Sequence, residues 1–142
     1  MLKFLVVILS LFLALGCNNK SVPLLSSGVS GTEGLPADQL SFASFKDIPI
    51  PDGSVMDMTN TVIFGSDDEW FGKLTILPNL SHAETFDFFR YEMPNLSWKE
   101  ITNVRSTSSV LSYEKNDRIV TIQISTSYGK TLCSISMSPK KI

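Results

Sequence analysis

The 142-residue chain has few of the residues that carry metal and nucleophile chemistry. It contains two cysteines and one histidine, His82, too few for a typical structural zinc site. Charged residues make up 18% of the chain and the formal net charge is −2, whereas nucleic-acid-binding domains are usually strongly basic. These shortages argue against a zinc protein, a histidine-dependent hydrolase and a nucleic-acid partner, and the length leaves room for one small domain.

The longest apolar run lies at the N-terminus. Residues 4–15 are apolar except for Ser10, and Lys3 precedes them. A helix of about 12 residues is roughly 18 Å long, which is too short to span a bilayer core of about 30 Å. A short basic region followed by a short apolar region and small residues is typical of a secretory signal peptide. We therefore assign residues 1–16 to a signal peptide.

The end of this segment reads Ala14-Leu15-Gly16-Cys17 and resembles the lipobox of bacterial lipoproteins. The resemblance implies that Cys17 becomes the acylated first residue of the mature protein. Two or more acyl chains anchor a protein stably to a membrane. Asn18 follows the cysteine where an aspartate is associated with inner-membrane retention, so the resemblance favours the outer membrane. The alternative is an ordinary signal peptide with an incidental cysteine.

The stretch from Cys17 to Phe45 has no helical or strand periodicity. It is rich in serine, glycine, asparagine and proline, a composition that buries too little apolar surface to offset the entropy of ordering. We expect residues 17–45 to be the acylated cysteine and a flexible tether, and residues 46–142 to be a single domain.

The first half of that domain predicts a β-hairpin and a helix. Residues 61–64 and 70–77 are β-rich runs separated by the polar loop 65–69. A capping-box pattern, Ser81 to Glu84, marks a helix start. Ala83, Phe86, Phe89 and Met93 then recur at helical spacing, and Pro94 should end the helix.

The second half predicts four strands, at residues 98–104, 109–114, 119–125 and 132–137. Val120, Ile122 and Ile124 alternate with polar residues, and Cys133, Ile135 and Met137 share one face of the last strand. The expected fold class is α+β, with one helix packed on an antiparallel sheet in the order β-β-α-β-β-β-β.

Candidate catalytic and metal-binding residues are few. Asp67, Asp68 and Glu69 are consecutive and lack the spacing of a calcium loop, so a solvated hairpin loop is the better interpretation. His82 has no obvious nucleophile to serve. Cys133 lies in the middle of a strand, which favours a small buried side chain over a reactive thiol or an intermolecular disulfide. We expect no catalytic residue and no cofactor, and we do not expect an enzyme.

Aromatic residues offer the one candidate binding surface. One face of the helix cannot bury all of its aromatic residues, so Phe88 and Tyr91, together with Trp70, are candidates for a recognition patch. The alternative is a wide apolar stripe that packs under the edges of the sheet.

The segments 48–53 and 85–100 resemble those of small bacterial envelope lipoproteins of uncharacterised function, with Ser97 where such sequences often have glycine. This resemblance implies no catalytic residue. The sequence favours a lipid-anchored envelope lipoprotein that binds or scaffolds another envelope protein. The alternative is a carrier that holds a small apolar ligand between the helix and the sheet.

Overall fold

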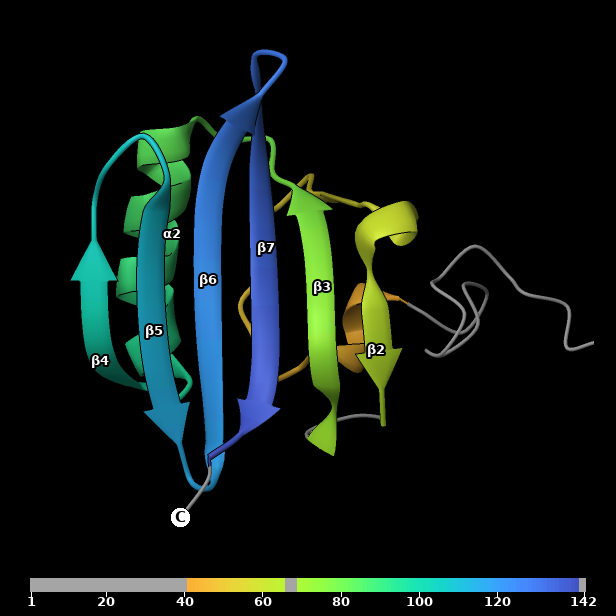
Figure 1. The fold of residues 1–142 in the computed structure, drawn as a ribbon, viewed down its shortest axis with the longest axis vertical. Helices are drawn as coiled ribbons and strands as arrows, with labels where there is room; N and C mark the ends of the chain where they lie inside the picture. The colour runs from red at the N-terminus through yellow and green to blue at the C-terminus, as the bar shows by residue number, and fades with distance from the viewer. Residues whose placement is uncertain (1–40, 66–68, 141–142) are drawn as a thin grey trace, which may run out of the picture.

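The computed structural model describes residues 41–65 and 69–140. These residues form one α-helix and a seven-stranded sheet (Figure 1). The strands are β1 (Val55–Met56), β2 (Val62–Phe64), β3 (Phe71–Leu77), β4 (Lys99–Val104), β5 (Ser109–Lys115), β6 (Arg118–Ser127) and β7 (Lys130–Pro139). The helices are α2 (His82–Asn95) and the short 3-10 helices η3 (Phe42–Ser44) and η4 (Met58–Asn60). The expected signal peptide, Cys17, Asp67 and Asp68 lie outside the described residues.

The sheet is antiparallel throughout, in the order β1-β3-β7-β6-β5-β4, with β2 also paired to β3. The predicted α+β class, with one helix on an antiparallel sheet, is confirmed. The predicted strands each correspond to an observed strand, with ends that move by a few residues. Only the two-residue β1 adds to the expected order, because so short a segment carries no periodic pattern.

β1 and β2 share the same edge of β3, and η4 separates them. At the interruption the Thr61 hydroxyl accepts a hydrogen bond from the Thr75 amide at 3.0 Å, so this buried N–H is satisfied without a strand partner. β2 crosses close to Gly72, where an added Cβ would lie 2.2 Å from the Val62 carbonyl oxygen. Only glycine therefore fits at this position of β3.

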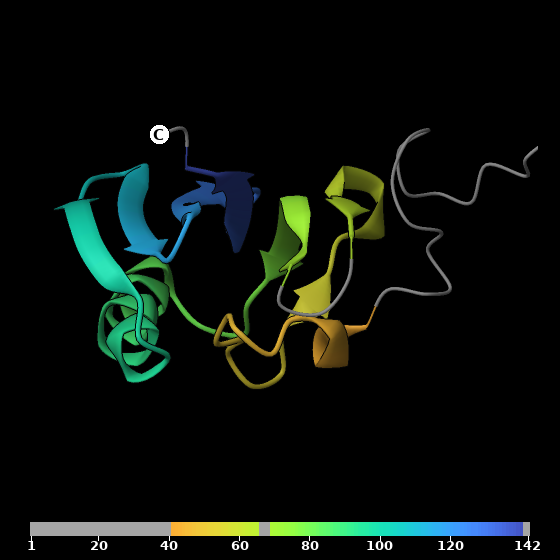
Figure 2. The same ribbon diagram turned by 90° about the horizontal axis from the view of Figure 1, so that it is seen from below.

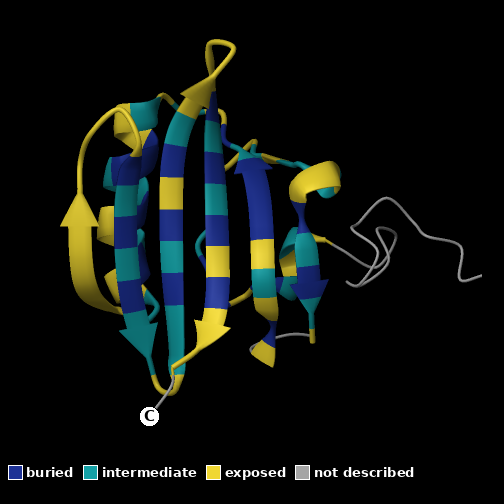
Figure 3. Cartoon of the chain, viewed as in Figure 1, coloured by how far each residue is buried: buried dark blue, intermediate teal, exposed yellow. Residues whose placement is uncertain are grey.

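Two elements cover the same face of the sheet (Figure 2). Helix α2 contacts β4, β5 and β6, and residues 41–54, here called the N-terminal strap, run beneath the β3 half. The buried core lies between these elements and the sheet, and Figure 3 shows it as alternating buried positions along the strands. Phe45, the last residue of the expected tether, is buried in this core. The folded domain therefore includes it.

The capping box predicted at the start of α2 is confirmed. Ser81 Oγ accepts from the Glu84 amide at 3.3 Å, and the Glu84 carboxylate accepts from the Ser81 amide at 2.9 Å. Phe86, Phe89 and Met93 are buried as expected, whereas Ala83 in the first turn is exposed.

The end of α2 is a Schellman motif. The helix continues one residue past Pro94, so the expected end at that proline was slightly too early. Ser97 adopts a left-handed φ of 65°, and the Ser97 and Trp98 amides donate to the carbonyl oxygens of Pro94 and Met93. Glycine adopts a left-handed φ more readily than serine does, so Ser97 is a strained residue at this position.

The opposite face of the sheet carries short hydroxyl side chains. The strand register aligns Thr102, Ser112, Thr121 and Ser136 in one row across β4, β5, β6 and β7. The hydroxyl oxygens of Ser112 and Thr121 lie 3.2 Å apart. Apart from η4 beside β3, no other element of the described residues lies over this face (Figure 2). The sheet is therefore apolar on one face and weakly polar on the other.

Candidate functional site

A polar cluster at one end of the sheet is built around Asp47 of the strap. The Trp70 indole N–H donates to the Asp47 carboxylate at 3.1 Å, and the Trp98 indole N–H donates to the Asp47 carbonyl oxygen at 2.7 Å. Arg118 Nη2 lies 2.8 Å from Asp47 Oδ2. The Asp47 side chain is 3% exposed and that of Arg118 is 15% exposed. One residue therefore joins the strap to three segments that are distant in sequence.

The Arg118–Asp47 contact is an ion pair rather than a full hydrogen bond. Asp47 Oδ2 and Arg118 Nη1 are both buried and, within the described ranges 41–65 and 69–140, neither has a hydrogen-bond partner. The short distance still gives strong attraction because water is largely excluded. The guanidinium also lies 5.5 Å from the centroid of the Trp98 ring, and the Lys115 ammonium lies 5.7 Å from it. Trp98 therefore has two cations next to it.

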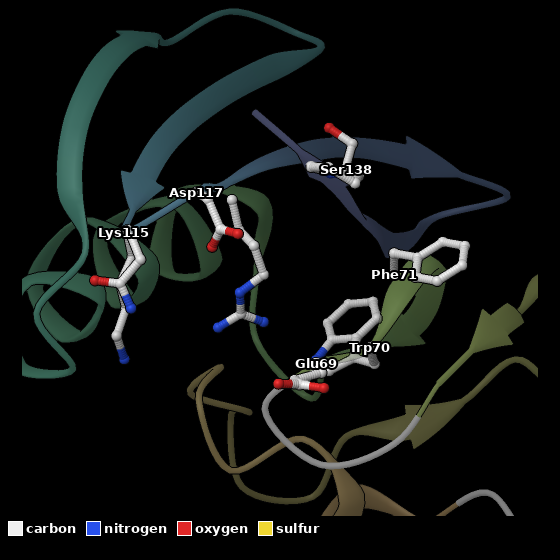
Figure 4. Close-up of a pocket in the computed structure, with 9 residues that line it drawn as sticks. Glu69, Trp70, Phe71, Lys115, Asp117 and Ser138 are labelled. Atoms are coloured by element: carbon white, nitrogen blue, oxygen red, sulfur yellow. The ribbon is translucent and has the colours of Figure 1, made fainter. Parts of the chain in front are cut away.

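A pocket of about 430 Å³ opens beside this cluster (Figure 4). It lies between the β5–β6 hairpin, the end of β7 and the start of β3. Its lining combines aromatic rings, both charge signs and a hydroxyl, contributed by Glu69, Trp70, Phe71, Lys115, Asn116, Asp117, Arg118, Ser138 and Pro139. Such a lining suits a polar ligand or a protein side chain.

The three sequence-predicted binding residues do not form one patch. Trp70 is 1% exposed and packs edge-on against Phe45, with ring centroids 5.1 Å apart, although it also lines the pocket. Phe88 is half-buried against Phe89 on α2, and Tyr91 is 65% exposed on the same helix. Because α2 covers the β4–β6 half of the sheet, Trp70 at the start of β3 lies apart from the helix residues.

Of the other candidate residues, His82 and Cys133 pack within the fold and Glu69 lies at the surface. His82 Nε2 lies 3.2 Å from the Ile124 carbonyl oxygen, which ties the first turn of α2 to β6. Cys133 is fully buried, and burial raises the pKa of its thiol well above the usual value. A thiol held in its protonated form is a poor nucleophile. Glu69 is exposed at the pocket rim. No group of three or more histidine, cysteine, aspartate or glutamate residues in the described part of the chain is arranged to hold a metal ion.

One exposed residue was not predicted from the sequence. Tyr128, at the tip of the β6–β7 hairpin, is fully exposed and has a positive φ of 48°. The sequence predicts only a turn at residues 127–130. The available signal was a bulky aromatic residue before Gly129, in a position where asparagine, aspartate or glycine is usual.

No family model, curated protein or solved structure matches this chain. In the part of the chain that the structure describes, no helix is both long enough and apolar enough to cross a bilayer.

Proposed function

We propose that the protein is a lipid-anchored lipoprotein of the bacterial cell envelope, and that its domain is a non-enzymatic module that binds another envelope protein. The observation that carries this proposal is the sequence Ala14-Leu15-Gly16-Cys17 at the end of a short apolar segment. Asn18 supports an outer-membrane location.

The surface of the domain supports a binding role. The polar groups of the cluster around Asp47 hold the strap to the sheet, and the adjoining pocket offers aromatic, charged and hydroxyl side chains to a partner. An exposed aromatic side chain that could meet a partner lies on another surface, at Tyr128.

The alternative, a carrier of a small apolar ligand between helix and sheet, receives less support. Phe86, Phe89 and Met93 on α2 are at most 2% exposed, and they face sheet residues that are equally buried. Side chains therefore fill the region that such a ligand would occupy. Native mass spectrometry of the mature domain tests this alternative, since a co-purified lipid would favour it.

The anchor is tested by replacing each of the two cysteines separately. We expect Cys17→Ala to abolish incorporation of a clickable palmitate analogue and to shift the protein from the membrane fraction. Cys133→Ala is the matched control, because Cys133 is buried and should not be acylated. Label and membrane retention that persist in Cys17→Ala would contradict the proposal.

A further inference from the structure

The β6–β7 hairpin extends beyond both strands that flank it. Pairing with β5 ends at Ile124, and pairing with β3 ends at Cys133. Within the hairpin, pairing continues as far as Ser127 and Lys130. Residues 125–132 therefore extend past both neighbouring strands, and residues 126–130 are exposed and project from the end of the sheet (Figures 1 and 3). This segment is not needed to complete the ladder of either neighbour.

The tip of the hairpin presents a tyrosine in an unfavourable backbone conformation. Tyr128 and Gly129 both have positive φ, 48° and 75°, which identifies a type I′ turn. Left-handed φ is uncommon for bulky residues and is strained. The Tyr128 side chain is also fully exposed, so contacts within the domain do not compensate for the strain. A residue that costs stability without packing inside the fold points to a role outside it.

The composition of the projecting segment suits protein recognition. Residues 125–132 read Ser-Thr-Ser-Tyr-Gly-Lys-Thr-Leu. Tyrosine combined with serine and glycine is typical of protein-binding loops, because tyrosine gives a large rigid contact and the small residues give adaptable hydrogen bonds. A membrane-binding tip would carry several cations with larger apolar residues. The tip has a single cation, Lys130, so a protein surface fits better than a lipid surface.

The charge of the tip indicates the sign of the charge on the partner's surface. Lys130 lines one pocket together with Asp57, but the Asp57 carboxylate is engaged in capping η4 through the Thr59 and Asn60 amides and the Asn60 side chain. Lys130 is exposed and is the one charged residue of the segment 125–132, so an acidic surface would be complementary to the tip. An apolar groove of about 740 Å³ adjoins the hairpin, with Leu77 and the 63%-exposed Val55 in its wall.

We infer that the β6–β7 hairpin tip docks into a concave, acid-rimmed site on a partner protein, with Tyr128 as the inserted aromatic side chain and Lys130 as the charge contact. Tyrosine and arginine residues are enriched among those that dominate binding energy at interfaces, and opposite charges at the rim set specificity. This inference names the binding surface of the module proposed above and rests on that proposal for its location in the envelope.

The test uses the full chain in the cells that produce it, with the photocrosslinker p-benzoylphenylalanine at position 128. A second variant carries the same probe at position 91, where the native tyrosine on α2 is also exposed. We expect one discrete protein adduct from position 128 and none from position 91. Lys130→Glu should reduce the adduct about tenfold or more, whereas Lys130→Arg should preserve it.

A charge exchange completes the test. After mass spectrometry has located the crosslinked peptide on the partner, replacing its neighbouring acidic residue with lysine should restore the adduct of the Lys130→Glu variant. The inference would be overturned by an adduct with lipid or with a second copy of the chain, or by equal adducts from both positions. It would also be overturned if Lys130→Glu left the adduct unchanged or if no adduct formed. An unacylated Cys17 with an intact adduct would instead refute only the lipid anchor.

Discussion

At the scale of single residues, the backbone angle of Tyr128 can be tested separately from its side chain, because the angle affects stability and the side chain is exposed. Its φ of 48° lies where asparagine is favoured and tyrosine is not. We expect Tyr128→Asn to raise the free energy of unfolding by about 1 kcal/mol, because Asn-Gly is the preferred pair for a type I′ turn. Urea denaturation of the described domain measures this change.

The neighbouring glycine provides the control. A Cβ at Gly129 would meet no atom within 4 Å, so Gly129→Ala tests the backbone conformation alone. It should lower the free energy of unfolding by about 1 kcal/mol. If Tyr128→Asn destabilised the domain instead, the tyrosine would contribute to folding, and its exposure would need another explanation.

Tyr113 links stability to alkaline pH. Burial first, and the negative charge of Glu100 second, raise the pKa of Tyr113 to about 12, against the lowering effect of Arg90. Because the folded state favours the protonated phenol, this stabilisation is complete below pH 10 and is lost as the pH rises from about 10 to 12. Tyr113→Phe should therefore flatten the fall in unfolding free energy over this range.

Denaturation curves at several pH values between about 9 and 12 measure this effect. The hydroxyl of Tyr113 lies 3.4 Å from the Phe89 carbonyl oxygen, so the variant also loses a long hydrogen bond at all pH values. Tyr128→Phe is the control, since it removes the hydroxyl of an exposed tyrosine. Equal pH profiles for Tyr113→Phe and the native protein would contradict the assignment.

At the scale of elements, the helix was predictable because its signals are local. The capping box lies within four residues, and the apolar spacing lies within three turns. β1 was missed because it exists only through pairing of Val55 and Met56 with the end of β3. The cluster around Asp47 was missed for the same reason, since its partners Trp70, Trp98 and Arg118 come together only in the folded chain.

The Schellman motif gives a prediction for the helix end. Ser97→Gly should raise the free energy of unfolding by up to about 1 kcal/mol, because glycine adopts the left-handed φ of 65° without a Cβ penalty. Thermal denaturation measures the change. Ala83→Gly is the opposite control at an exposed helical position and should lower stability by about the same amount. A loss of stability in Ser97→Gly would show that the serine side chain matters.

At the scale of the whole molecule, the strap covers the half of the sheet that α2 does not cover. The sheet is covered by α2 on one half and by residues 41–54 on the other. The strap is held by the burial of Phe45 and Ile48 and by the polar contacts of Asp47. The central row of the outer face carries hydroxyl side chains, including the half-buried Thr121 and the exposed Ser136, which water can solvate.

The strap is therefore sensitive to the charge of Asp47. Asp47→Asn should lower the free energy of unfolding by about 2 kcal/mol, because Arg118, whose side chain is only 15% exposed, is left without its counter-ion. Asp87→Asn is the matched control. Its carboxylate pairs with Arg105 on the surface, where both side chains are more than 40% exposed, and the loss should be below about 1 kcal/mol.

Urea denaturation compares the two variants, and limited proteolysis shows whether Asp47→Asn frees the strap before the domain unfolds. Equal losses in the two variants would mean that burial does not distinguish the pairs. Cleavage confined to residues 41–54 would mean that the strap opens as a unit.

The position of Asp47 has a mechanical consequence. A force applied from the N-terminal side reaches the folded domain at the strap. Asp47 transmits this force through its contacts with Trp70 before β3, Trp98 before β4 and Arg118 at the start of β6. The load is thus divided among three strands instead of peeling one strand from an edge. Tension along the chain is resisted by contacts that must break together.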